Sequence, residues 1–156
     1  MWQVPISTPA GPWVTGMSPN SSSNLANTYT FTFTDTNSFQ DITVANILVN
    51  TAIDARHGCY VAFVPATSSV LLVDDAGDAG GPYSGMVLPG SGSVSNSQCM
   101  ISGIGSSVNG SGNTLTLTLA ITFTQSFAGN QVFFLSARNN NGQNSNWQSL
   151  GTVAVP

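Results

Sequence analysis

The sequence predicts an all-β protein that folds as a two-sheet antiparallel β-sandwich of seven to nine strands with one inter-strand disulfide. Three observations predict this class. Apolar and polar residues alternate along most of the chain, β-branched residues fill the alternating segments, and Asp, Asn, Gly or Pro separates them at short intervals. No segment has the apolar spacing of an amphipathic helix. A closed β-barrel is the main alternative.

Eight segments carry the strand pattern. Residues 28–36 alternate Tyr29, Phe31 and Phe33 with threonines, and residues 113–124 place Leu, Ile and Phe on one face. The other predicted strands are residues 41–50, 59–65, 69–74, 91–103, 130–138 and 147–156. Turn signals recur about every 8 to 12 residues, which is typical of sandwiches of the immunoglobulin or fibronectin type III kind.

The length of 156 residues fits a single domain with its own hydrophobic core. Residues 1–24 are rich in Pro, Ser and Gly, so we expect an extended N-terminal arm or linker, followed by the sandwich over residues 25–156. Val-Pro occurs at residues 4–5 and again at residues 155–156. The arm could therefore be the tail of a preceding repeat, although chance similarity explains the match equally well.

Charge is scarce: charged residues make up 5% of the chain, and the formal net charge is −4. The only cations are Arg56 and Arg138, so no basic patch exists for nucleic acid or for an anionic membrane surface. No apolar run approaches the roughly 20 residues that span a bilayer, so we expect no membrane insertion. The N-terminus lacks the basic and apolar regions of a signal peptide.

The two cysteines, Cys59 and Cys99, lack the spacing and neighbours of a zinc site. In a Thr- and Ser-rich β protein such a pair suggests one disulfide that pins the two sheets together, and hence an oxidising compartment. Two buried free thiols are the alternative. We expect the protein to be extracellular or attached to a cell surface.

Several segments occur in an order that is more specific than any one of them. They are TFTFTDTNSFQDITVANILVN, CYVAFVP, LLVDDAG, GSGSVSNSQC, GSGNTLTLTLAITFTQSFAGN and SARNNNGQNSNWQSLGTVAVP. The series resembles an immunoglobulin- or fibronectin-III-like β-sandwich module of large secreted or surface multidomain proteins of soil bacteria. This resemblance covers residues 17–156 and implies export and pairing of the two cysteines. Trp147, Gly151 and Thr152 fit the last strand of that family, but Val153 and Ala154 stand where a Trp is common. The family has no settled activity.

Catalytic constellations are weak in this sequence. The single histidine, His57, follows Asp54, but no Gly-x-Ser-x-Gly elbow accompanies them. Glycosidases need two carboxyl groups on opposite sides of a cleft, and the acids of residues 74–78 are too close in sequence to straddle a substrate. We therefore expect that the protein is not an enzyme.

Carboxylates and amides gather in two segments at predicted strand ends. The candidate metal ligands are Asp35, Asn37 and Asp41 in the first segment and Asp74, Asp75 and Asp78 in the second. Calcium takes oxygen ligands of these kinds, and a site would form if both segments and residues 139–141 met at one end of the sandwich. Neither segment matches an EF-hand. The alternative is that Asp and Asn make turns with glycines.

The amide-rich loop 137–148 ends in Trp147, and Tyr83 lies in a Gly-rich segment expected to be a loop. Aromatic rings beside amides suit a glycan, so the candidate ligand-binding residues are Trp147, Tyr83, Asn141 and Asn144. Trp147 could instead pack against the core. We expect an accessory module that binds polysaccharide or a cell surface for a larger secreted protein. The alternative is a structural spacer or self-assembling subunit that contacts neighbouring domains or copies through its arm and edge strands.

Overall fold

The computed structural model describes residues 11–78, 81 and 83–156. Its strands are β1 (Trp13–Ser18), β2 (Ser21–Ser22), β3 (Ala26–Thr34), β4 (Ile42–Asn50), β5 (Cys59–Val64), β6 (Ser69–Val73), β7 (Tyr83–Val87), β8 (Ser93–Ser95), β9 (Cys99–Ser111), β10 (Thr114–Phe123), β11 (Gly129–Asn139) and β12 (Gln148–Val155). Two short 3-10 helices, η1 (Phe39–Asp41) and η2 (Gln125–Phe127), join strands. In the described part of the chain, no helix has the length and apolar character needed to cross a bilayer.

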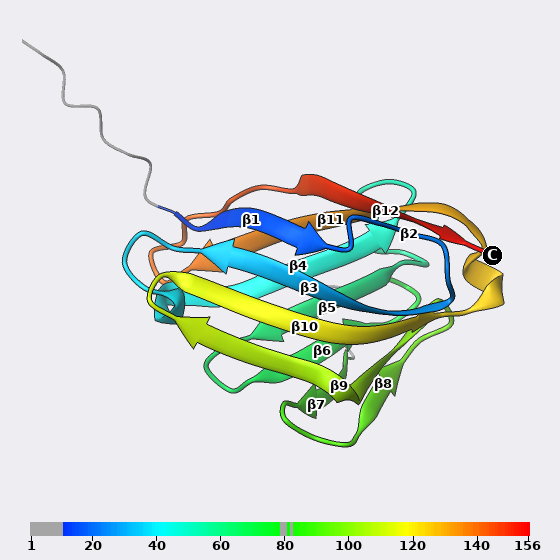
Figure 1. The fold of residues 1–156 in the computed structure, drawn as a ribbon, viewed down its shortest axis with the longest axis horizontal. Helices are drawn as coiled ribbons and strands as arrows, with labels where there is room; N and C mark the ends of the chain where they lie inside the picture. Colours follow the sequence, from blue (N-terminus) through cyan, green and yellow to red (C-terminus); the bar gives the residue numbers. More distant parts are fainter. Residues whose placement is uncertain (1–10, 79–80, 82) are drawn as a thin grey trace, which may run out of the picture.

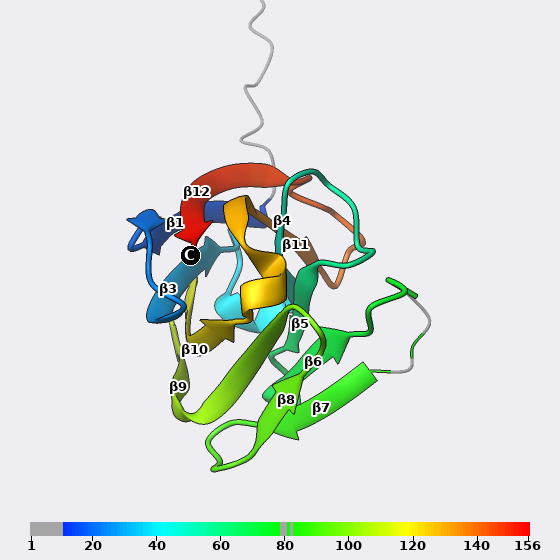
Figure 2. The ribbon, with the colours of Figure 1, turned by 90° about the vertical axis from the view of Figure 1, so that its right-hand side faces the viewer.

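The strands form two sheets packed face to face (Figures 1 and 2). The five-stranded sheet has the order β1-β3-β10-β9-β8, and the seven-stranded sheet has the order β2-β12-β11-β4-β5-β6-β7. All pairs are antiparallel except the short β12–β2 pair. The prediction of an all-β, two-sheet sandwich is therefore confirmed.

The core lies between the sheets because alternate residues of each strand face inward. In β3, Tyr29, Phe31 and Phe33 are fully buried, while the threonines between them face outward. The ring centroids of Tyr29 and Phe133 lie 4.8 Å apart across the two sheets. Aromatic side chains from both sheets thus fill the middle of the sandwich.

The disulfide between Cys59 and Cys99 is present and joins the sheets. Cys59 begins β5 of the seven-stranded sheet, and Cys99 begins β9 of the five-stranded sheet. Both cysteines are fully buried in the core. The predicted pairing is confirmed, and the alternative of two free thiols is wrong.

Several boundaries differ from the predictions. The described residues form twelve strands, more than the seven to nine expected. Residues 13–18 and 21–22 of the predicted arm form β1 and β2, so the sheets begin before residue 25. Val14 and Met17 of β1 pack against the core, which explains why this Pro-rich segment is extended along β3. The rest of the predicted arm, residues 1–10, lies outside the described residues.

Two further differences concern the middle of the chain. The predicted strand 91–103 is two strands, because a turn at residues 96–98 separates β8 from β9. The segment around Tyr83, expected to be a loop, is the edge strand β7, which pairs with β6. In Figure 2, β7 and β8 lie side by side although they belong to different sheets.

The sandwich has two ends, which we name by one residue each. At the Asp35 end, β3, β9 and β11 finish; at the Asp75 end, β4, β6 and β10 finish. The C-terminus lies at the Asp75 end, at the right of Figure 1.

Candidate functional site

The outer surface of the seven-stranded sheet carries the residues that alternate with the core residues of β11, β4, β5, β6 and β7. The pairing register aligns these residues in three rows that cross the strands. The rows are Phe134, Leu48, Tyr60, Val73 and Tyr83; then Ser136, Asn46, Ala62, Leu71 and Gly85; then Arg138, Val44, Val64, Ser69 and Val87. Three of the five residues in the first row are aromatic, and the third row begins with the cation Arg138.

A hollow of about 350 Å³ lies on this outer surface. Its lining consists of Val44, Asn46, Tyr60, Ala62, Val64, Leu71, Val73, Tyr83 and Arg138. The small side chain of Ala62, which lines the hollow, leaves room in the middle row, between the tyrosines and the third row. Since four residues separate the first row from the third, the hollow extends about 13 Å along the strands.

Polar and aromatic contacts hold Tyr60 in place at this hollow. The Tyr60 hydroxyl donates to Asn46 Oδ1 at 3.4 Å, and Asn46 Nδ2 donates to Ser136 Oγ at 3.3 Å. The ring of Trp147 meets the Tyr60 ring edge-on, with the centroids 5.8 Å apart. Burial raises the pKa of Tyr60, and the neighbouring Tyr83 adds to this while Arg138 opposes it. The hydroxyl therefore stays protonated and able to donate.

The structure brings together only part of the predicted ligand-binding set. Tyr83 is 41% exposed at the start of β7 and lines the hollow, whereas half-buried Trp147 lies beside Tyr60. Asn141 and Asn144 are exposed in the turn between β11 and β12 and are not among the residues that line the hollow. Asn144 Oδ1 instead accepts a hydrogen bond from Asn146 N at 2.8 Å.

Three lining residues were missed by the sequence reasoning: Tyr60, Asn46 and Arg138. Tyr60 follows a cysteine in an apolar strand, and the sequence analysis assigns it no role beyond the predicted strand 59–65. The available signal was alternation: if Cys59 faces inward to form a disulfide between sheets, its neighbour Tyr60 must face outward.

The candidate metal ligands do not form one site. Asp35, Asn37 and Asp41 lie at the Asp35 end, where Asn140 N donates to Asp41 O at 2.9 Å. The second segment lies at the Asp75 end, because β6 runs towards that end and the segment follows β6 directly. It contains Asp74, Asp75 and Asp78. The hypothesis that both segments meet is therefore wrong. Within residues 11–78, 81 and 83–156, no three Asp, Glu, His or Cys side chains are grouped to hold a metal ion.

At the Asp35 end, a buried amide connects three segments. Asp35 is fully buried, and its carboxylate accepts from Asn37 N at 3.0 Å and from Asn139 Nδ2 at 3.1 Å. Asn139 Nδ2 also lies 2.7 Å from Gly11 O, and Asn139 Oδ1 accepts from Gln143 N at 3.0 Å. Asn139 thus ties β3, the segment before β1 and the β11–β12 turn together.

At the Asp75 end, the carboxylate of Asp75 accepts hydrogen bonds from both the backbone N and the hydroxyl of Ser97. The side-chain bond is the main reason why the pKa of Asp75 is lowered, and the backbone bond adds to it. Asp74 Oδ1 accepts from Asp78 N at 3.2 Å. These contacts are those of a turn that shapes the end of the sandwich.

Because the two acidic segments lie at opposite ends of the sandwich, each segment would have to bind calcium without the other. Because protein groups already donate to Asp35 and Asp75, we expect the thermal midpoint to be the same in millimolar calcium and in excess chelator. Differential scanning calorimetry measures this directly. A midpoint that rises by several degrees with calcium would contradict the expectation, and Asp35→Asn and Asp75→Asn would then show which end binds the ion.

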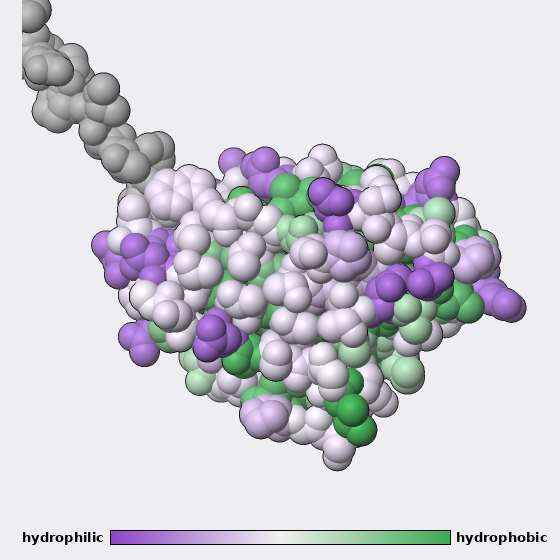
Figure 3. Space-filling model, viewed as in Figure 1, coloured by the Kyte–Doolittle hydropathy of each residue, from purple (hydrophilic) through white to green (hydrophobic). Residues whose placement is uncertain are grey.

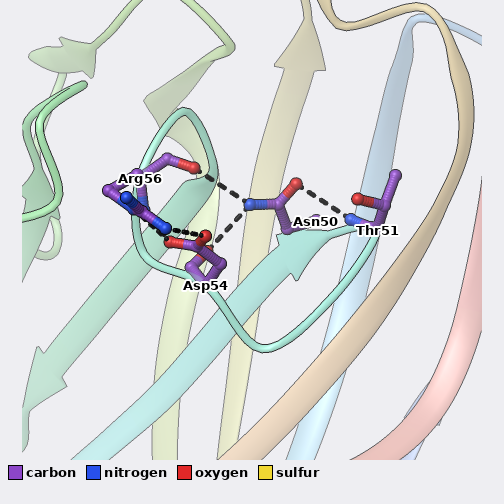
Figure 4. Close-up of polar contacts among 4 residues, drawn as sticks. All are labelled: Asn50, Thr51, Asp54 and Arg56. Carbon is purple, nitrogen blue, oxygen red and sulfur yellow. Dashed lines mark hydrogen bonds and ion pairs between the residues drawn. The ribbon is translucent and has the colours of Figure 1, made fainter.

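The loop between β4 and β5 holds the histidine and the first of the two arginines. Arg56 pairs with Asp54, with Nη2 2.9 Å from Oδ2 and Nε 3.1 Å from Oδ1. Asn50 Nδ2 donates to the backbone oxygens of Asp54 and Arg56 (Figure 4). The bond from Arg56 is the main reason why the pKa of Asp54 is lowered to about 2. His57 adopts a φ of 53°, and its backbone N donates to Asp75 O.

No protein-family model matches the chain, and no curated protein matches it significantly. Function therefore has to be argued from the residues of the site.

Proposed function

We propose that the protein is a non-catalytic extracellular accessory module that binds a polysaccharide or cell-surface glycan for a larger secreted protein. The observation that carries this proposal is the hollow on the seven-stranded sheet, which has Tyr60 and Tyr83 in one row and the Asn46 amide in the next. Sugar rings stack on aromatic faces, and amides bond their hydroxyls. The site would recognise the sugar and leave its bonds intact.

The setting is part of the same proposal. A disulfide that joins the sheets is typical of oxidising compartments, which supports secretion. The sandwich architecture supports the resemblance to immunoglobulin- or fibronectin-III-like modules of secreted or surface proteins of soil bacteria. Modules of that kind act beside other domains, so we propose that this one anchors its neighbours to a glycan.

Removing an aromatic wall of the hollow tests this function. We expect Tyr60→Ala and Tyr83→Ala each to weaken glycan binding about tenfold, because an aromatic contact contributes about 1 kcal/mol beyond its buried area. Trp147→Ala is expected to act in the same direction, since its ring steadies Tyr60. Affinity electrophoresis on a panel of soluble glycans and pull-down on insoluble ones measure binding.

Ile104→Ser is the matched control, because Ile104 is 70% exposed on the five-stranded sheet, away from the hollow. It should bind as the unaltered protein does. Far-ultraviolet circular dichroism establishes that each variant is folded. If no glycan retards the protein, or if Tyr60→Ala and Tyr83→Ala are retarded like the control, the proposal is contradicted.

A second candidate is a structural or self-assembling subunit, and a bulge in β9 favours it. Ser107 pairs with Thr118 and Ser102 with Ala120, so residues 103–106 loop out of the ladder. The bulge exposes Ile104, and Val87 on the edge strand β7 is 58% exposed. Absence of glycan binding, together with sedimentation that depends on concentration and is lost in Ile104→Ser, would favour this candidate.

A further inference from the structure

Arg138 is the second of the two arginines in a chain with no lysine. The first, Arg56, is neutralised by Asp54 at 2.9 Å. Among the residues that the structure describes, no carboxylate lies within 4.0 Å of the Arg138 guanidinium, and this group donates no side-chain hydrogen bond. Arg138 is exposed on the outer face of β11. The fold therefore presents one cation that has no internal partner.

This cation lies at the hollow and not at a random surface position. Arg138 lines the hollow together with Tyr60, Tyr83 and Asn46. The six carboxylates are placed elsewhere, since Asp35 and Asp41 lie at one end of the sandwich and the remaining four at the other. None of them is among the lining residues. The residues that line the hollow thus include one positive side chain and no negative one, although the chain has a net charge of −4.

The chemistry of these groups selects a ligand. A guanidinium presents a planar pair of N–H donors that matches a carboxylate, and the pairing is stronger where water is partly excluded. Tyrosine rings suit the apolar face of a sugar ring, and an amide suits its hydroxyls. A single molecule that offers an apolar ring face, hydroxyls and one carboxylate per unit is a uronic acid.

We infer that the hollow takes a carboxylate-bearing sugar, a uronic acid unit of an acidic polysaccharide, with its carboxylate on Arg138 and its ring against Tyr60 and Tyr83. This inference rests on the proposed glycan function and names the class of glycan. The site would bind this acidic glycan in preference to a neutral glycan of the same shape, because the neutral glycan leaves Arg138 without a partner.

Two forms of one polymer test the inference: polygalacturonate, and the same polymer with its carboxyl groups reduced to primary alcohols. We expect affinity electrophoresis and calorimetry to give binding of polygalacturonate that is at least about tenfold tighter, since a hydrogen bond to a charged group contributes more than a neutral one. Added salt should weaken the polygalacturonate complex and leave the neutral one unchanged.

Three variants assign the effect to Arg138. Arg138→Gln should remove the preference for the charged polymer, and Arg138→Lys should retain part of it because charge remains without the planar fork. Arg56→Gln removes the other arginine of the chain, which does not line the hollow, and should leave the preference intact. Both glutamine variants change the net charge equally, so a general effect of charge would move them together.

The outcomes that overturn the inference are distinct from failure of the proposed function. Equal binding of the two polymers, or a preference that survives Arg138→Gln, would overturn the uronic acid assignment and leave glycan binding standing. Binding of neither polymer would also overturn it, and the wider panel described above then decides whether the protein binds any glycan.

Discussion

Replacing both Cys59 and Cys99 by alanine is expected to lower the free energy of unfolding by about 4 kcal/mol. The bridge closes a loop of 40 residues between the two sheets, and opening that loop returns conformational freedom to the unfolded chain. Urea denaturation followed by circular dichroism measures the change, at protein concentrations where unfolding is reversible. The folded variant should retain the β spectrum.

The disulfide prediction has a control in the same protein. The oxidised protein should be insensitive to an alkylating reagent, and the alanine variant should unfold with a larger dependence on urea, because its unfolded chain exposes more surface. A loss of stability below about 1 kcal/mol would mean that the bridge does not constrain the unfolded state as the loop length implies.

Replacing Asn139 by alanine is expected to cost about 3 kcal/mol of stability. The change removes the donor to the buried carboxylate of Asp35 and the acceptor for the backbone N of Gln143. Asp35 Oδ1 would keep its hydrogen bond from Asn37 N, but Asp35 Oδ2 would lose its donor, and a buried polar atom left without a partner is costly. Urea denaturation against the unaltered protein gives the difference.

The adjacent amide is the matched control for this prediction. Asn140 is exposed, and its side-chain amide reaches Asp41 Oδ1 only at 3.5 Å. Asn140→Ala should therefore change stability by less than about 0.5 kcal/mol. If Asn139→Ala and Asn140→Ala proved equal, the buried hydrogen bonds of Asn139 would not be what holds the Asp35 end together.

The alternating segments predicted the sheets well because burial on one face imposes a period of two. The Thr-Phe alternation of residues 28–34 and the Thr-Leu alternation of residues 114–119 both correspond to strands with one buried face. Their threonines form the uncharged outer face of the five-stranded sheet, and Figure 3 shows this face as largely pale, of intermediate hydropathy.

Edge strands were less predictable because their pairing depends on distant segments. The short strand β7 contains Gly85 and follows a Gly-rich stretch, which is typical of a loop, and only its pairing with β6 makes it a strand. In β1, Val14 and Met17 are separated by a bulge at residues 14–16, so the apolar period is broken.

The site was predictable only in part. Sequence patterns indicate which side chains are candidates, but they do not show at which end of the sandwich each loop lies. Tyr83 and Trp147 were singled out as exposed aromatics, yet their relation through Tyr60 depends on the register of five strands. The two acidic segments looked alike in sequence, but strand direction sends them to opposite ends of the sandwich.

The central claim is that the outer face of the seven-stranded sheet binds the glycan, and a nuclear magnetic resonance titration tests it most directly. A galacturonate oligosaccharide is added to isotope-labelled protein, and amide shifts are followed residue by residue. We predict shifts concentrated in β4, β5, β6, β7 and β11 around Tyr60, Tyr83 and Arg138. Shifts confined to the threonine face of β3 and β10, or no shifts at all, would contradict it.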